Sequence, residues 1–304
     1  MSDVALYAKS RYSAAMTRCL LIMMACCAQL CTAAADSLIA TIPVKMLHNR
    51  IILNAKINDS GPHTFLLDTA CTIPTIHPKL VEELKLERAG RVRINGIAGM
   101  ERAPTYRHVV FMLGNASYKP HRVASIPSER DHSRKRDGVI GSSFFETFVV
   151  EMRPRDKVVK LHDPQKFKYA GKGEIVPFRL REEIPVIDAT IELKDGPQLK
   201  AEFELDTGCD SGLCFGEHYV REHSLVKKLK GKESEKFGIG GSVETVDVRI
   251  PVLRLGAKEF KNAQGDLFLD GSPVDEPLAG HIGMGVLSRG VVIFDYARKQ
   301  VILE

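Results

Sequence analysis

Two aspartates that follow strand-like apolar runs are the residues best suited to chemistry in this sequence. Asp68 stands in "LLDTA" (66–70) and Asp206 in "ELDTG" (204–208). Two carboxylates held a few ångströms apart cannot both ionise at low cost, so one pKa rises, the other falls, and the pair holds one proton. Such a pair can activate a water molecule and protonate the carbonyl that the water attacks. That chemistry cleaves an amide without a covalent intermediate.

A repeat over the whole chain gives a reason for the two aspartates to meet. Similar segments recur in the same order, at offsets that grow from 134 to 142 residues. They are "IPVKML" (42–47) with "VPFRLR" (176–181), "NAKI" (54–57) with "DATI" (188–191), "RINGIAGM" (93–100) with "KFGIGGSV" (236–243), and "DGVIG" (137–141) with "AGHIG" (279–283). Because duplication relates equivalent residues by a pseudo-twofold axis, as in a symmetric dimer, we expect the two carboxylates to lie close together.

The elements that must position these residues are mainly strands. Most segments are short, rich in β-branched residues and alternate with period two. A Gly-Pro turn is expected in each half, at Gly61-Pro62 and Gly196-Pro197. Helical patterns are limited to 79–87, 217–230 and the apolar pieces after Gly141 and Gly283. The predicted fold class is mostly β, with two pseudo-twofold-related, β-barrel-like lobes packed together.

The first 35 residues read as a secretory signal peptide. Basic residues precede the apolar run 19–30, and small residues follow it. No later apolar run is long enough to cross a bilayer. We therefore expect a secreted or periplasmic protein without stable membrane insertion after signal removal; the alternative is a chain anchored by an uncleaved N-terminal segment. The predicted domains are a signal peptide (1–35), an N-terminal lobe (36–163), a linker (164–173) and a C-terminal lobe (174–304).

The acidic turns resemble the Asp-Thr-Gly turns of aspartic proteases. The segments "VIG" (139–141) and "HIG" (281–283) resemble that family's apolar-apolar-Gly element, which crosses behind the catalytic turn. Several ordered elements, each present twice, are far more specific than one Asp-Thr-Gly alone. The resemblance covers roughly residues 38–304 and is closer to retropepsin-like bacterial aspartyl proteases than to pepsins. It implies the bilobal aspartic protease fold, with Asp68 and Asp206 as the catalytic pair.

The resemblance also assigns supporting roles beside the catalytic pair. Thr69 and Thr207 would cross-bond beneath it, each hydroxyl meeting the backbone of the opposite lobe, since one hydroxyl both donates and accepts. Ala70 and Gly208 take the third position of the turns, where the backbones approach closely and a small residue is needed. Ala70 departs from the family's glycine.

Two glycine-bearing hairpins are candidate flaps, because a flexible hairpin can close over an extended peptide and exclude water. Either hairpin could be the working flap. The residues concerned are Gly96, Ile97, Ala98, Gly99, Gly238, Ile239, Gly240 and Gly241.

Three cysteines, Cys71, Cys209 and Cys214, remain once the signal peptide is removed. We expect buried thiols; a Cys209–Cys214 or a Cys71–Cys209 bridge is the alternative. Cys71 and Cys209 directly follow the acidic turns, where a hydroxyl would donate to the carboxylate and lower its pKa. A thiol donates weakly, so we expect a less acidic pH optimum than that of a pepsin.

The predicted function is that of a secreted or periplasmic aspartic endopeptidase that uses a water molecule activated between Asp68 and Asp206. A catalytically silent peptide-binding protein on the same scaffold is the alternative, because fold does not fix activity; the intact aspartates and threonines favour catalysis. No metal-ligand spacing occurs, and we expect no metal or cofactor. Removal of residues 1–35 lowers the net charge from +5 to +3, which points to no particular partner. The only tight basic cluster is "RKR" (134–136) and Trp is absent, so we expect no nucleic acid partner. The expected partner is a peptide or protein substrate, and the expected state is a monomer.

Overall fold

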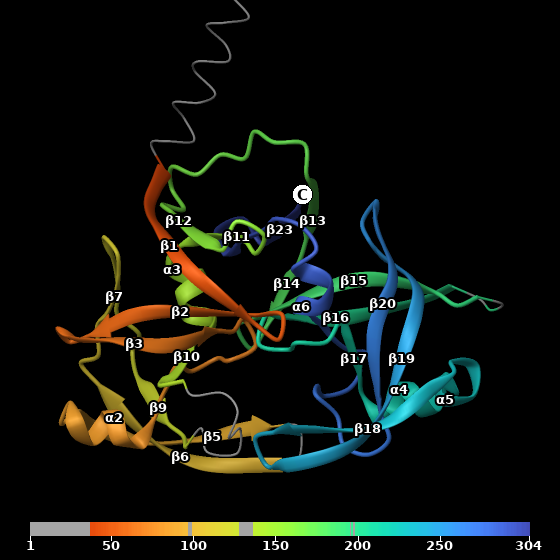
Figure 1. Cartoon of the computed structure of the whole chain (residues 1–304), viewed down its shortest axis with the longest axis horizontal. Coiled ribbons are helices and arrows are strands. Elements are labelled where there is room, and N and C mark those ends of the chain that lie inside the picture. Colours follow the sequence, from red (N-terminus) through yellow and green to blue (C-terminus); the bar gives the residue numbers. More distant parts are fainter. Residues whose placement is uncertain (1–36, 97–98, 128–135, 195, 197) are drawn as a thin grey trace, which may run out of the picture.

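The computed structural model describes residues 37–96, 99–127, 136–194, 196 and 198–304, and the fold is mostly β, as predicted (Figure 1). The predicted signal peptide lies outside these residues. The strands are β1 Leu38–Leu47, β2 Arg50–Ile57, β3 Ser60–Leu67, β4 Thr75–Ile76, β5 Glu87–Gly96, β6 Gly99–Arg107, β7 Phe111–Leu113, β8 Ala116–Tyr118, β9 Val123–Ser125, β10 Gly138–Ile140, β11 Val149–Arg153, β12 Val158–His162, β13 Glu174–Pro177, β14 Arg179–Arg181, β15 Ile184–Glu192, β16 Gln198–Asp206, β17 Leu213–Phe215, β18 Gly231–Gly238, β19 Gly241–Leu255, β20 Lys258–Phe268, β21 Gly280–Gly283, β22 Val292–Asp295 and β23 Gln300–Leu303. The helices are α2 Pro78–Glu83, α3 Ser142–Thr147, α4 Glu217–Glu222, α5 Leu225–Lys228, α6 Met284–Leu287 and the 3-10 helix η1 Tyr296–Arg298.

The strands form two sheets. One has fifteen strands, thirteen of them in the order β13-β23-β22-β11-β12-β1-β2-β3-β10-β4-β9-β6-β5, with β7 and β8 attached beside β2. The other has eight strands in the order β14-β15-β16-β21-β17-β20-β19-β18. The first sheet joins the two sides of the predicted linker, because β11, which precedes the linker, pairs antiparallel with β22, which follows it. β13 extends this sheet by pairing antiparallel with β23. The two halves of the chain are therefore joined by backbone hydrogen bonds.

Alternating burial along the strands explains why they form. In β2 every second residue from Ile51 to Ile57 is buried, so one face packs into the core. Behind this face the rings of Phe65, Phe111, Tyr118 and Phe144 follow one another with centroids 5.3, 5.6 and 5.3 Å apart. Aromatic pairs at such distances add about 0.5–1.5 kcal/mol each beyond the burial of their area. This core holds β3, which leads to Asp68, in a fixed position.

The short helices lie where helical patterns were predicted. α2 falls within 79–87 apart from its first residue, and α3 and α6 follow Gly141 and Gly283. The pattern at 217–230 forms two helices, α4 and α5, because Ser224 takes a left-handed conformation with φ of 51° and ends the first helix. Among the described residues, no helix is both long enough and apolar enough to span a membrane.

One predicted turn was wrong by a few residues. Asn58 and Asp59, with φ of 43° and 67°, make the turn between β2 and β3, whereas Gly61 lies inside β3. Asn and Asp tolerate positive φ and suit a two-residue hairpin turn. The Gly-Pro dipeptide therefore lies within the first residues of β3 and does not make the turn.

Equivalent strand arrangements surround the two acidic turns. In the first half of the chain (37–163), β10 lies parallel to β3 and antiparallel to β4. In the second half (174–304), β21 lies parallel to β16 and antiparallel to β17. Each of β3 and β16 leads directly into an aspartate, so each "apolar-apolar-Gly" segment runs alongside the strand that presents a carboxylate.

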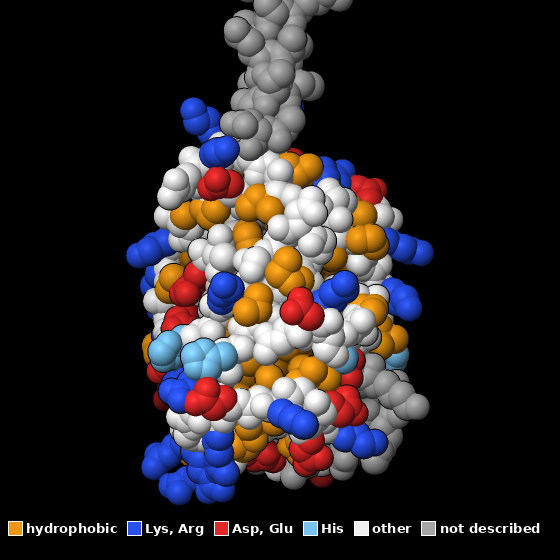
Figure 2. Space-filling view, turned by 90° about the vertical axis from the view of Figure 1, so that its left-hand side faces the viewer, with side chains coloured by type: hydrophobic (Ala, Val, Ile, Leu, Met, Phe, Trp, Pro, Cys, Tyr) orange, Lys and Arg blue, Asp and Glu red, His pale blue; other side chains and the backbone are white. Residues whose placement is uncertain are grey.

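The surface carries charges of both signs. On the face in Figure 2, acidic, basic and apolar side chains are interspersed, and Lys and Arg side chains gather at one lower corner. Most of the apolar side chains among the described residues are buried, but Met100 and Phe237 are 58% and 69% exposed. Both belong to the two candidate flap hairpins, so these hairpins present apolar side chains to the solvent.

Candidate active site

Asp68 and Asp206 lie at matching places, at the ends of β3 and β16. The backbone N–H of Ala70 donates to Asp68 Oδ1 at 2.8 Å. The N–H groups of Gly208 and Cys209 donate to Asp206 Oδ1 at 2.7 and 3.1 Å. Each carboxylate is thus held by its own turn, and Asp206 has one more donor than Asp68.

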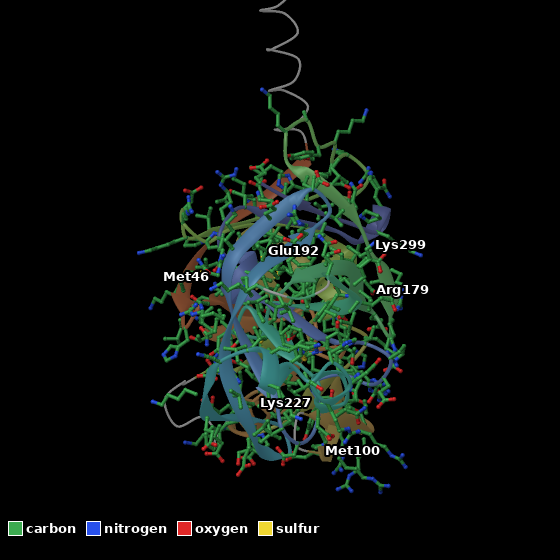
Figure 3. All side chains as sticks on the ribbon, turned by 90° about the vertical axis from the view of Figure 1, so that its right-hand side faces the viewer. Met46, Met100, Arg179, Glu192, Lys227 and Lys299 are labelled. Atoms are coloured by element: carbon green, nitrogen blue, oxygen red, sulfur yellow. The ribbon has the colours of Figure 1, made fainter. Side chains whose placement is uncertain are left out.

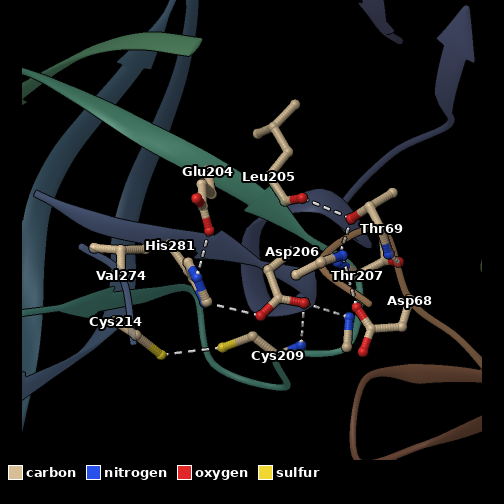
Figure 4. Close-up of polar contacts among 12 residues, drawn as sticks. Asp68, Thr69, Glu204, Leu205, Asp206, Thr207, Cys209, Cys214, Val274 and His281 are labelled. Atoms are coloured by element: carbon tan, nitrogen blue, oxygen red, sulfur yellow. Dashed lines mark hydrogen bonds and ion pairs between the residues drawn. The ribbon is translucent and has the colours of Figure 1, made fainter. Parts of the chain in front are cut away.

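The two threonines join the turns by crossed hydrogen bonds (Figure 4). The N–H of Thr69 donates to Thr207 Oγ1 at 3.0 Å, and the N–H of Thr207 donates to Thr69 Oγ1 at 3.0 Å. Each hydroxyl then donates onward across the pair, Thr69 to the carbonyl of Leu205 at 2.6 Å and Thr207 to that of Leu67 at 3.0 Å. Both threonines are fully buried. The hydrogen bonds expected from the resemblance are present, and they bring the two turns together.

Gly208 allows the two carboxylates to approach. A Cβ atom at this position would overlap the carboxylate of Asp68. Any larger residue would push the two turns apart, which explains why the second turn keeps glycine. Ala70, on the first turn, is accommodated with its side chain partly exposed.

The surroundings shift the pKa values of the two carboxyl groups in opposite directions. Burial, together with the neighbouring charge of Asp206 and a hydrogen bond to it, raises the pKa of Asp68 to about 7. Burial opposes ionisation of Asp206 as well, but His281 and the N–H of Gly208 outweigh it and hold the pKa of Asp206 below its ordinary value. At mildly acidic pH the pair therefore carries one proton, on Asp68.

His281 and Glu204 were missed as site residues. His281 Nδ1 lies 2.8 Å from Asp206 Oδ2, and His281 Nε2 lies 2.9 Å from Glu204 Oε2 (Figure 4). The internal repeat carried a signal for them, because His281 and Glu204 pair in register where the first half has Val139 and Leu66. Ionisable residues stand in the second half at positions that are apolar in the first.

The three cysteines among the described residues, Cys71, Cys209 and Cys214, are free thiols in the structure. Cys71 Sγ donates to the carbonyl of Ile73 at 3.1 Å, and Cys209 Sγ lies 3.0 Å from Cys214 Sγ. The hydrogen bonds found for these thiols therefore go to groups other than Asp68 and Asp206. Among the described residues, these hydrogen bonds include no thiol donor to either carboxyl group. The less acidic pH optimum expected from the sequence stays a prediction.

The two candidate flap hairpins meet at their tips. β5 pairs with β6 so that Gly96 faces Gly99, and β18 pairs with β19 so that Gly238 faces Gly241. A Cβ atom at Gly96 would overlap the backbone of Ile239, and Figure 1 shows the hairpins end to end along the lower edge of the molecule. The exposed Met100 of β6 lies at this lower end, far from Lys299 (Figure 3). Ile97 and Ala98 lie outside the described residues.

The hairpin of β18 and β19 is tied to the second acidic turn. Lys236 Nζ lies 3.0 Å from Asp266 Oδ2, which also accepts a hydrogen bond from the hydroxyl of Ser211. Asp266 is fully buried. Ser211 follows Cys209 and Asp210 in the turn, so one carboxylate holds both the hairpin and the turn. At the matching place in the first hairpin stands the uncharged Ile94.

The turn between β1 and β2 clamps the second acidic turn from the other half of the chain. Arg50 Nη1 donates to the carbonyl of Gly208 at 3.3 Å, and its Nη2 lies 3.2 Å from Asp210 Oδ2. The side-chain amide of Asn49 donates to the carbonyl of Asp210 at 2.9 Å. The charge-assisted contacts of Arg50 and the neutral hydrogen bond of Asn49 together fix the orientation of the turn that carries Asp206.

No group of His, Cys, Asp or Glu side chains among the described residues is arranged to hold a metal ion. Comparison with protein-family models finds that residues 53–144 match an aspartyl protease family of the retropepsin-like clan. The expected resemblance is thus confirmed over a span that contains Asp68, Thr69 and the first hairpin. No curated protein matches the chain.

Proposed function

We propose that this chain, whose residues 53–144 match the aspartyl protease family, is an aspartic endopeptidase that hydrolyses peptide bonds with a water molecule activated between Asp68 and Asp206. The observation that carries the proposal is the crossed bonding of Thr69 and Thr207, which joins the two acidic turns. The opposite pKa shifts of the two carboxyl groups support it further, because they provide one acid and one base at the same pH.

In the proposed reaction the ionised Asp206 accepts a proton from water as the water oxygen attacks the peptide carbonyl carbon. Asp68 donates its proton to the carbonyl oxygen, so a neutral gem-diol forms. The diol then returns one proton to Asp68, the nitrogen takes the proton held by Asp206, and the C–N bond breaks. The products are a carboxylic acid and an amine, and the pair again holds one proton.

The proposal includes a duplicated, two-lobed architecture, with a lobe at 36–163, a linker at 164–173 and a lobe at 174–304. The parallel pairing of β10 with β3 and of β21 with β16 supports it, since each half presents its aspartate in the same strand setting. The sheet shared by β11, β12, β22 and β23 would then tie the lobes together. A single chain would suffice for one catalytic pair, so we propose a monomer.

The substrate would be an extended peptide covered by the hairpins, bound by strand-like backbone hydrogen bonds. The hairpin of β5 and β6 is the better candidate for the moving flap, because Lys236 ties the other hairpin to the buried Asp266. The sequence pattern of residues 1–35 supports a secreted or periplasmic location.

The test is hydrolysis of a mixed peptide library by the purified protein from pH 3 to pH 8. Asp68→Asn and Asp206→Asn should each lower the rate by about 100- to 10,000-fold, and a pepstatin-type inhibitor should block the wild type. Asp188→Asn, an exposed aspartate on β15, is the matched control and should keep the wild-type rate. A folded wild-type protein that binds peptides but cleaves none at any pH would overturn the proposal in favour of a peptide-binding protein.

A further inference from the structure

The imidazole of His281 lies between two carboxylates. Its Nδ1 is 2.8 Å from Asp206 Oδ2 and its Nε2 is 2.9 Å from Glu204 Oε2. An ionised carboxylate only accepts hydrogen bonds, and a neutral imidazole has only one N–H to donate. With both carboxyl groups ionised, satisfying both contacts requires the imidazolium form, with a proton on each nitrogen. All three residues are only 8% exposed, so water does little to replace either contact.

The groups that face His281 favour this charge. Its own strand, β21, lies between β16 and β17. β16 contributes Glu204 and Asp206, and β17 places Cys214 in register with His281. Burial would lower the pKa of His281, but Asp206 and Glu204 raise it well above the ordinary value. The pKa of the Cys214 thiol is also raised, chiefly by its contact with Cys209, so this thiol stays neutral.

We propose that His281 is a positively charged positioning residue, held between Glu204 and Asp206, that keeps Asp206 the ionised member and Asp68 the protonated member of the pair. The first half of the chain lacks such a device, because Leu66 and Val139 occupy the matching register. The inference rests on the proposed function, since it assigns the base to Asp206 and the acid to Asp68. Two identical Asp-Thr turns thereby acquire different roles.

Removal of the positive charge of His281 should raise the pKa values of both aspartates. A positive charge in contact with a carboxylate lowers its pKa by about 1–3 units. Without His281 the pKa of Asp206 should rise, so the acid limb of the kcat/KM profile should move to higher pH. The charge of His281 also lowers the pKa of Asp68, as the smallest of several effects. The alkaline limb should therefore move to higher pH as well, by a smaller amount.

The main variant is the double substitution Glu204→Leu with His281→Val, which copies Leu66 and Val139. It replaces a buried ion pair by an apolar pair, a change that proteins often tolerate. The single variant Glu204→Gln keeps the imidazole and removes one of its two charges. The matched control is His162→Gln, because His162 Nε2 lies 3.0 Å from Glu151 Oε2 in an equally buried pair that is not part of the site.

Two measurements test the role of His281 separately from the proposed peptidase activity. The first is the titration of His281 by imidazole NMR, which needs no activity. His281 should stay protonated above pH 7 in the wild type and should lose its proton at lower pH in Glu204→Gln. The second is the pH profile of kcat/KM, whose acid limb should rise by about 1–3 units in the double variant and stay fixed in His162→Gln.

A neutral His281 at pH 6 in the wild type would overturn the inference whether or not the chain is a protease. An unchanged acid limb in a folded, active double variant would overturn it while leaving the proposed function intact. Loss of the proposed function alone would show as a protonated His281 in a protein that cleaves no peptide.

Discussion

The two acidic turns share their Asp-Thr sequence but not their surroundings. Asp68 has one backbone donor within its turn and an apolar pair, Leu66 and Val139, behind it. Asp206 has two backbone donors and a histidine. The pKa of Asp68 is consequently raised to about 7, chiefly by burial, whereas that of Asp206 is lowered against the effect of burial. The chemistry of a turn is thus decided by residues on neighbouring strands as well as by the turn itself.

The largest expected difference between the two turns is in the free energy of unfolding that is lost when the aspartate of each turn is replaced. Asp206→Asn removes a carboxylate from a buried ion pair and leaves His281 with Glu204 only, which should cost about 3 kcal/mol near pH 6. Asp68→Asn replaces a carboxyl group that must take up a proton on folding at pH 6, because its pKa is raised from 3.8 to about 7. The variant should therefore cost less than about 1 kcal/mol or stabilise the fold. Urea denaturation of both variants measures the difference.

The pH dependence of this difference follows from the lowered pKa of Asp206. A carboxyl group with a lowered pKa in the folded state stabilises the fold above its unfolded pKa, and this contribution disappears as the pH falls through the folded value. The advantage of the wild type over Asp206→Asn should therefore shrink below the ordinary aspartate pKa of 3.8. Equal losses of stability in Asp206→Asn and Asp68→Asn at pH 6 would contradict the claim that the two carboxyl groups differ in ionisation.

A smaller loss of stability, similar in the two turns, is expected when Thr69 or Thr207 is replaced. Thr69→Val and Thr207→Val each leave a buried N–H of the opposite turn without its acceptor, at a cost of about 1–3 kcal/mol. The two losses should be similar, because the N–H bonds that lose their acceptor are both 3.0 Å long, although the hydroxyl of Thr69 makes a shorter onward bond (2.6 Å) than that of Thr207 (3.0 Å). Thermal unfolding measures them, and Thr64→Val, at a half-buried threonine of β3 with a long 3.4 Å hydrogen bond, is the control. A much larger loss of stability in one of the two variants, Thr69→Val or Thr207→Val, would mean that the two turns differ in stability although their threonine contacts match.

The smallest expected effect concerns the hairpins. The amides of β18 should exchange with deuterium more slowly than those of β5, since Lys236 binds the buried Asp266. Lys236→Ile, which copies Ile94 of the first hairpin, should bring the two exchange rates together. Faster exchange in β18 than in β5 of the wild type would reverse the assignment of the moving flap.

Local patterns in the sequence predicted the elements that carry the site. Alternation predicted the strands, glycine pairs predicted both hairpins, and the repeat predicted the approach of the two turns. The resemblance to aspartic proteases, not the repeat, predicted the crossed bonds of Thr69 and Thr207. The turn at Asn58 and Asp59 was misplaced, because a Gly-Pro dipeptide is a strong turn signal that here begins a strand.

Contacts between distant segments could not be predicted in the same way. The pairing of β11 with β22 joins residues about 140 positions apart, and no local pattern specifies such a partner. The contact between His281 and Glu204 depends on the register of β21 against β16. A comparison of the two halves position by position would have revealed the ionisable pair, but its effect on Asp206 requires the geometry.

The most direct test of the account is the pH profile of kcat/KM for a peptide that the wild-type protein cleaves. Activity requires Asp206 ionised and Asp68 protonated, so the profile should be bell-shaped. Its alkaline limb should fall near pH 7, where Asp68 loses its proton, and its acid limb should lie below the ordinary aspartate pKa of 3.8. A rate that stays constant to pH 8 and above, or that survives in Asp68→Asn, would contradict a catalytic pair with one shared proton.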